Sequence, residues 1–298
     1  MLRKAQPPGR LDRLPPQSFF LVSAVFHYLG PSMAVLLFAR VDVLGVAWLR
    51  IATAAVLFAA WRRPWRFLTR LSRGGLILLA SLGVVLAAMN TVFYLAVDRL
   101  PLSTVGAIEF LGTMIVAAIG IRTRRNVAAL ALTVAGVAAI TAIRLTGHPL
   151  GFAFAFGNCV LFMLYVLLGH RIANSRAGSR AGSRADAPRG IDLLAAAMLI
   201  AALTATPIGL AGALPAFPHP VLLLAGAAVG VCSSVIPYVT DQLAMARLPR
   251  ATFALMLALL PVFATLIGAI VLRQVPTIRD IAGIALVTVG VAIHTEGR

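Results

Sequence analysis

Long, nearly uninterrupted runs of apolar residues alternate with short polar and basic segments along most of the 298-residue chain. Each run is about 20 residues long, the length at which an α-helix crosses the roughly 30 Å hydrocarbon core of a bilayer. The runs lack the polar–apolar alternation of membrane β-barrel strands. The pattern therefore predicts an all-α integral membrane protein with ten transmembrane helices, at residues 18–39, 42–61, 75–97, 102–121, 126–143, 150–172, 191–213, 221–245, 251–272 and 281–294.

Composition excludes a water-soluble domain and gives no sign of an enzyme. Hydrophobic residues make up 60% of the chain and charged residues 12%, against about 25% charged in a typical soluble domain. Cys159 and Cys232 both lie inside apolar runs, without the spacing of a disulfide framework or a metal site. The chain contains no phosphate-binding loop, no H-E-x-x-H and no C-x-x-C motif. We therefore expect no enzymatic activity, no cofactor and no metal.

The net charge of +17 comes from basic clusters between the apolar runs. Of the 26 Lys and Arg residues, 20 fall in segments that are cytoplasmic if the N-terminus is inside, and five fall in the outer loops. This bias follows the positive-inside rule and predicts that both termini are cytoplasmic. The clusters lack the interleaved aromatic residues on which bases stack, so no nucleic-acid partner is expected. The first apolar run has no cleavage site and is expected to remain as a span.

A short motif occurs twice, as "LAVDRLP" at 95–101 and "LAMARLP" at 243–249, with five of seven positions identical. Each copy closes one apolar run and leads into the next. The repeat divides the chain into two five-helix halves, residues 18–143 and 150–294, with a flexible, basic cytoplasmic loop at 174–190. Because five is odd, the second half is inverted relative to the first. Inverted repeats are typical of secondary transporters that work by alternating access.

Two opposite charges are expected near the middle of the membrane. Arg50 is the ninth residue of its predicted span and Glu109 the eighth of its own, and both spans start outside. At 1.5 Å per residue, both lie about 10–12 Å below the outer surface. We expect them to pair across the bundle, either as a structural ion pair or as a site that contacts a charged substrate or carries a proton.

Further polar residues form stripes on single helix faces, because residues three, four or seven apart share a face. The stripes contain Asn90 and Tyr94 in one span, Ser233, Ser234 and Tyr238 in another, Asn158 and Tyr165 in a third, and His27 in the first. We expect these residues, with Arg50 and Glu109, to line one wet cavity that binds and translocates the substrate. Pro31 and Pro237 are placed to interrupt their helices and free carbonyl groups toward this cavity.

Asp241 lies about 30 Å along its span and is therefore expected near the inner surface. There it is within reach of Arg247 or Arg250. We interpret it as an interfacial charge, with a role in an inner gate as the alternative.

Four segments resemble the drug/metabolite transporter superfamily: "AWLRIATAAVLF" (47–58), "WRRPWR" (61–66), "MNTVFYLAVDRLPLSTVGAIEFLG" (89–112) and "CSSVIPYVTDQLAMARLP" (232–249). Within it the chain is most similar to the EamA-type amino-acid exporters, the threonine/homoserine and YddG-like group. The resemblance implies ten helices in two inverted halves around a central cavity. It also implies export of amino acids or related metabolites. The sequence departs from the family pattern at Thr113, where proline is usual, and at Leu260–Pro261, where an acidic residue usually precedes the proline.

The sequence thus predicts a secondary transporter that exports amino acids or related metabolites across the bacterial cytoplasmic membrane. Its partners are a small-molecule substrate and the lipid bilayer, and a monomer is compatible with the sequence. Two alternatives stay open, an exporter of drugs or other metabolites with the same fold and a membrane protein without a transport role. The amino acids carried, the coupling to protons and the oligomeric state are not determined by the sequence.

Overall fold

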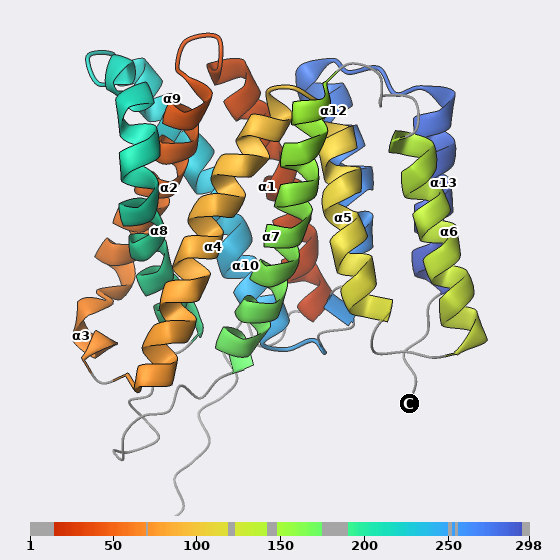
Figure 1. Ribbon diagram of the computed structural model, residues 1–298, viewed down its shortest axis with the longest axis horizontal. Helices are drawn as coiled ribbons and strands as arrows, with labels where there is room; N and C mark the ends of the chain where they lie inside the picture. Colours follow the sequence, from red (N-terminus) through yellow and green to blue (C-terminus); the bar gives the residue numbers. More distant parts are fainter. Residues whose placement is uncertain are drawn as a thin grey trace, which may run out of the picture.

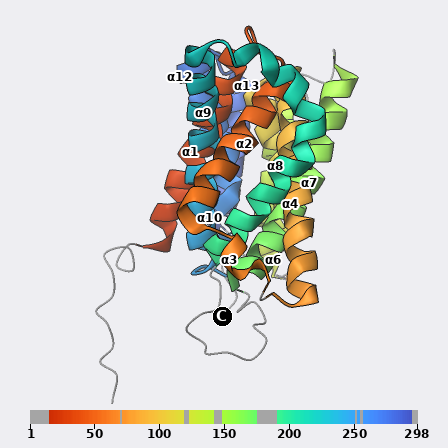
Figure 2. The ribbon, with the colours of Figure 1, turned by 90° about the vertical axis from the view of Figure 1, so that its left-hand side faces the viewer.

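A computed structural model describes residues 15–69, 71–118, 123–141, 148–174, 190–249, 252–253 and 256–293. In these ranges the secondary structure consists of helices joined by short turns and loops, without a strand. The helices run roughly parallel to one another between two rims (Figures 1 and 2). The loop predicted at 174–190 lies outside the described residues except for its two ends.

Helices occupy the predicted apolar ranges. The long ones in the first half are α1 (Pro16–Leu37), α2 (Val43–Arg62), α4 (Arg73–Val97), α5 (Leu102–Ala118) and α6 (Arg124–Thr141), with the short α3 (Trp65–Leu68) after α2. The second half contains α7 (Pro149–Asn174), α8 (Gly190–Ala213), η2 (Leu214–Ala216), α9 (Pro220–Gly230), η3 (Val231–Val235), α10 (Ile236–Met245), η4 (Leu257–Leu259), α12 (Leu260–Leu272) and α13 (Ile278–Ile293). The elements α9, η3 and α10 form one continuous helical rod, in which η3 is a π-helical turn.

Six helical segments in the described residues are long and apolar enough to cross a membrane. They are Gln17–Leu37, Val43–Arg62, Arg73–Val97, Pro149–Ile172, Gly190–Ala216 and Pro220–Met245. Large apolar side chains face outward from the bundle, for example Leu203, Val221 and Ile270, which are 73%, 76% and 74% exposed. In water such exposure is unfavourable, whereas a lipid surface accommodates it. The chain is an integral membrane protein.

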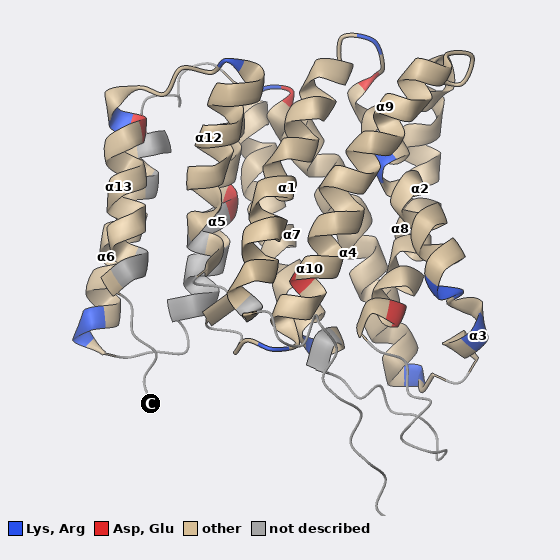
Figure 3. Ribbon diagram, turned by 180° about the vertical axis from the view of Figure 1, so that it is seen from behind, with Lys and Arg blue, Asp and Glu red and all other residues tan. Residues whose placement is uncertain are grey.

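Polar residues mark where the helices begin and end. The Asp42 carboxylate accepts hydrogen bonds from the backbone amides of Leu44 (2.9 Å) and Gly45 (3.4 Å) at the start of α2. The Ser72 hydroxyl accepts one from the amide of Gly75 (3.2 Å) at the start of α4. These side chains bind amide hydrogens that have no partner within the helix. Lys, Arg, Asp and Glu are concentrated near the rims, and the middle of the bundle is almost free of them (Figure 3).

At some helix contacts the backbones approach closely because one residue is glycine. The contact of α2 with α8 and that of α6 with α13 are the most extensive in the described bundle. A Cβ atom on Gly45 of α2 would lie 2.2 Å from the carbonyl oxygen of Gly212 on α8, so only glycine allows this approach. Small residues of this kind drive helix association in lipid, where hydrophobic burial contributes little.

Candidate functional site

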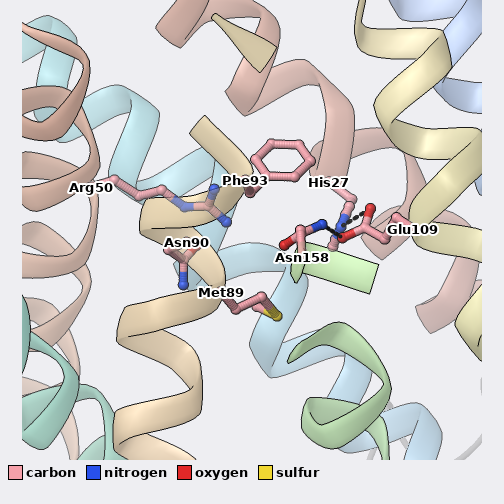
Figure 4. Close-up of a pocket in the computed structure, with 7 residues that line it drawn as sticks. All are labelled: His27, Arg50, Met89, Asn90, Phe93, Glu109 and Asn158. Carbon is pink, nitrogen blue, oxygen red and sulfur yellow. Dashed lines mark hydrogen bonds and ion pairs between the residues drawn. The ribbon is translucent and has the colours of Figure 1, made fainter. Parts of the chain in front are cut away.

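A small pocket lies inside the bundle and is lined by side chains of five helices (Figure 4). Its lining residues are His27 of α1, Arg50 of α2, Met89, Asn90 and Phe93 of α4, Glu109 of α5 and Asn158 of α7. The pocket's free volume is about 10 Å³, which is roughly the space that one water molecule needs. All the predicted site residues that line it are at least nine-tenths buried.

Arg50 is held on one side of the pocket by neutral oxygen atoms. Its Nε donates to the Ser234 hydroxyl (2.8 Å), and its Nη2 donates to the Ser233 carbonyl (2.8 Å) and the Tyr238 hydroxyl (3.5 Å). The Ser233 carbonyl is free for this bond because Pro237, four residues later, has no amide hydrogen to donate. The predicted role of Pro237 in freeing a carbonyl is therefore seen here, with an arginine as the partner.

The turn that holds Arg50 depends on a close approach between α1 and η3. A Cβ atom on Gly30 would lie 2.2 Å from the Ser233 hydroxyl oxygen and 2.6 Å from the Ser233 nitrogen. Gly30 therefore lets the backbone of α1, just before Pro31, lie against the π-helical turn. Such turns are uncommon and are frequently found at functional sites.

Glu109 lies on the opposite side of the pocket (Figure 4). The Asn158 amide nitrogen donates to Glu109 Oε1 (3.0 Å), and the Tyr28 hydroxyl donates to Oε2 (3.3 Å). His27 Nε2 lies 3.8 Å from Oε2 and forms an ion pair with it when the imidazole is protonated. The exposed fraction of Glu109 is 2%, so these neighbours replace almost all of its contact with solvent.

The predicted pairing of Arg50 with Glu109 is wrong. The two residues line the same pocket, but no ion pair joins them among the described residues. The structure nevertheless brings both side chains to one pocket. Depth along a helix says nothing about which neighbouring group each side chain meets first, and each finds its partners on its own side.

Asn90 and Tyr238 contact each other directly, although they are 148 residues apart. The Asn90 amide nitrogen lies 3.0 Å from the Tyr238 hydroxyl, and that hydroxyl lies 3.1 Å from Asn90 Oδ1. The same amide nitrogen also donates to the Leu86 carbonyl at 2.6 Å. The offset of 148 equals the separation of the two repeated motifs.

Not all the predicted site residues line the pocket. Three of them bond instead to the lining residues Arg50 and Asn90, namely Ser233, Ser234 and Tyr238. The Tyr94 ring lies against the Arg50 guanidinium, with 5.3 Å from Cζ to the ring centroid. The Tyr94 hydroxyl is buried and has no hydrogen-bond partner in the described part of the chain.

Tyr165 belongs to a separate buried cluster around Asp241. The Tyr165 hydroxyl donates to Asp241 Oδ2 (2.9 Å), and the Ser23 hydroxyl donates to Oδ1 (2.5 Å). The Tyr165 ring also packs against Tyr238, with ring centroids 5.5 Å apart. Asp241 is 2% exposed, because α1 and α7 cover it within the bundle. Its roles as an interfacial charge or as part of an inner gate stay predictions. Arg250 lies outside the described residues.

Sequence reasoning missed three residues at the pocket. Met89 and Phe93 line it, and they are four residues apart on the helix that also contributes Asn90. The Tyr28 hydroxyl reaches Glu109 from the position next to His27. Met89 and Phe93 were overlooked because apolar residues in a membrane helix give no contrast with lipid-facing ones. Tyr28 could have been found, because a tyrosine inside a span requires a partner for its hydroxyl.

The chain is similar to known transporters. The EamA-like transporter family profile matches residues 177–295. The chain is 31% identical over 280 residues to the threonine/homoserine exporter RhtA of Escherichia coli (strain K12), covering 91% of this chain and 88% of that protein. The same figures hold for the threonine/homoserine exporter RhtA of Salmonella typhimurium (strain LT2). A solved crystal structure, 19% identical, matches with a TM-score of 0.63 over 93% of this chain and 96% of that one.

The crystal structure's low identity limits that likeness to the fold. The similarity to the exporters extends over nine-tenths of the chain. The matched family and relatives are transporters, and the chain is not an enzyme. The chain belongs to the EamA-type amino-acid exporters of the drug/metabolite transporter superfamily.

Proposed function

We propose that this chain exports small polar amino acids, such as threonine and homoserine, from the cytoplasm through the pocket between Arg50 and Glu109. The relatives at 31% identity carry the name of a threonine/homoserine exporter. The observation in this chain that supports an amino-acid substrate is a buried pocket with one positive and one negative side chain that do not pair with each other. A free amino acid carries the same two charges.

The proposal includes ten membrane spans arranged as two inverted repeats, residues 18–143 and 150–294. Three pairs of helices at equivalent places in the two halves pack against each other, namely α2 with α8, α5 with α12, and α6 with α13. Contact between equivalent elements is expected around a twofold axis. The contact between Asn90 and Tyr238 supports an axis that passes beside the pocket.

As a member of this family, the chain is a multi-pass protein of the bacterial cytoplasmic membrane. We place both termini and the 174–190 loop in the cytoplasm. The start of α1 and the end of α13 lie at the same rim as α3 (Figure 1), which supports a common side for the two termini. Basic residues in the predicted inner segments outnumber those in the outer loops by 20 to 5, in agreement with this orientation.

Transport follows an alternating-access cycle in this proposal. The free volume of about 10 Å³ is too small for an amino acid, so the substrate enters only when the lining helices move apart. Inverted halves that rock about a fixed central site open it to one side of the membrane at a time. His27, Asn90 and Asn158 supply hydrogen bonds that replace the substrate's lost hydration, which an apolar wall cannot do.

Reconstitution into liposomes tests the proposal. Purified protein in liposomes should move radiolabelled threonine and homoserine faster than large aromatic amino acids or cationic drugs. Each flux is measured with and without a pH gradient, so that proton coupling is detected in the same experiment. Export of drugs with no movement of any amino acid would reject the amino-acid assignment and favour a drug exporter with the same fold.

A further inference from the structure

Two buried charges in the pocket lack a formal counter-ion in the described part of the chain. The hydrogen-bond acceptors of Arg50 are a hydroxyl, a carbonyl and a phenol, all neutral. Glu109 has two neutral donors and a histidine 3.8 Å away, which is charged only when protonated. A buried charge without a counter-charge is costly in a membrane interior. An arrangement with two such charges on opposite sides of one pocket indicates that something else supplies the compensation.

Two residues that line the pocket have unused hydrogen-bonding atoms. Nε and Nη2 of Arg50 form its three hydrogen bonds to described residues, and Nη1 forms none. Asn158 Oδ1 is fully buried and accepts no hydrogen bond in the described part of the chain. The Asn158 amide turns its nitrogen to Glu109, and its oxygen points away, toward the side of the pocket where Asn90 and Met89 lie (Figure 4).

We infer that the pocket binds the amino-acid zwitterion in one orientation, with the α-carboxylate at Arg50 and the α-ammonium group at Glu109 and Asn158. This inference rests on the proposed amino-acid substrate. The guanidinium donates to the carboxylate, and Glu109 and the free Asn158 oxygen accept from the ammonium hydrogens. The substrate side chain then contacts Met89 and Phe93, and the flexible methionine adapts to side chains of different shape.

Asn90 and Tyr238 act as positioning residues in this arrangement. The Tyr238 hydroxyl contacts both Arg50 Nη2 and the Asn90 amide, so it links the cation to α4. The Ser234 hydroxyl accepts from Arg50 Nε, and the Ser233 carbonyl accepts from Nη2. Three neutral groups thus hold Arg50 in place without cancelling its charge, which stays available for the carboxylate.

Three probe compounds test the orientation: L-threonine, L-threoninamide, which lacks the carboxylate charge, and 2,3-dihydroxybutanoate, which lacks the ammonium group. The affinity of each is measured from the rise in unfolding temperature of the purified protein over a concentration series. In the wild type, both analogues should bind roughly tenfold or more weakly than threonine, because each has lost hydrogen bonds to a charged group.

The variants Arg50→Gln and Glu109→Gln should change these affinities in opposite patterns. Arg50→Gln should lower the affinity for threonine to the wild-type affinity for threoninamide, and it should change the affinity for threoninamide by less than about threefold. Glu109→Gln should lower the affinity for threonine to the wild-type affinity for dihydroxybutanoate, and it should leave the affinity for dihydroxybutanoate unchanged. Equal weakening of all three compounds in both variants, or the opposite pattern, overturns the orientation.

A third variant and a control complete the experiment. Asn158→Ala removes the free oxygen without changing charge, and it must weaken threonine more than dihydroxybutanoate even if Arg50→Gln does not fold. Arg62→Gln serves as the matched control, because Arg62 is ion-paired with Asp192 away from the pocket and should leave all three affinities unchanged. If wild-type protein binds threonine but the variants do not show these selective losses of affinity, only the orientation is wrong. If it binds no amino acid, the proposed function fails as well.

Discussion

The same substitution at two fully buried tyrosines should have opposite effects on stability. Tyr238 and Tyr94 are both 0% exposed, and replacing either with phenylalanine removes one hydroxyl and leaves the ring. The Tyr238 hydroxyl bonds with Asn90 and lies 3.5 Å from Arg50 Nη2. The Tyr94 hydroxyl has no hydrogen-bond partner among the described residues.

The expected magnitudes follow from what each deletion leaves behind. After Tyr238→Phe, Arg50 Nη2 keeps the Ser233 carbonyl and the Asn90 nitrogen keeps the Leu86 carbonyl. Only Asn90 Oδ1 becomes an unpaired buried group, at a cost of about 1–3 kcal/mol. Hydrogen bonds between side chains inside membrane proteins contribute about 0.6 kcal/mol to stability on average. We therefore expect Tyr238→Phe to lower the free energy of unfolding by about 1 kcal/mol. Tyr94→Phe leaves no group unpaired and should be neutral or stabilising.

Both variants are purified in detergent, and their unfolding temperatures and export rates per inserted molecule are measured. One kcal/mol corresponds to a shift of about 2–4 °C, so Tyr238→Phe should unfold at least about 2 °C below Tyr94→Phe. Its export rate should also fall, because Arg50 loses one of its supports. Asn90→Leu should lower export too, and adding Tyr238→Phe to it should have little further effect. Indistinguishable behaviour of the two tyrosine variants would refute this account of the site.

Two further predictions concern packing and topology. Gly30→Ala places a Cβ atom 2.2 Å from the Ser233 hydroxyl oxygen and should abolish export or folding. Gly74→Ala, with no atom within 4 Å of its Cβ position, should be tolerated. If Gly30→Ala exported as well as Gly74→Ala, the close contact of α1 with η3 would be unimportant. Cysteine reporters at 174–190 should be labelled from the cytoplasmic side alone and reporters at 214–220 from the outside alone, and labelling of both from one side would refute the inverted repeat.

The positions of the helices could be predicted from the sequence because a bilayer restricts the alternatives. An apolar run of about 20 residues must form a helix there, since unpaired backbone groups are too costly in lipid. The predicted run 75–97, for example, is α4 at Arg73–Val97. In the predicted run 251–272, the described residues 252–253 and 256 and the 3-10 helix η4 are helical, and α12 itself begins at Leu260. Residues 254–255 lie outside the described ranges.

Partners of the buried charges could not be predicted in the same way. A sequence gives the depth of a side chain along its helix, but the rotation of each helix and its neighbours depend on packing. Arg50 therefore meets a carbonyl freed by Pro237, not Glu109. Asp241 was predicted near the inner surface from its depth, and depth does not reveal that helices supplying Ser23 and Tyr165 cover its side chain.

The absence of an Arg50–Glu109 ion pair is what makes the proposed site suitable for a zwitterion. Had the two side chains paired, each would have neutralised the other, and a substrate would have had to break that pair before binding. Neutral acceptors satisfy the hydrogen bonds of the Arg50 guanidinium but leave its positive charge uncompensated. The Ser233 carbonyl is one of these acceptors because Pro237 interrupts the backbone hydrogen bonding of its helix. The helix break thus serves recognition: it anchors a cation in the membrane while its charge remains available to a carboxylate.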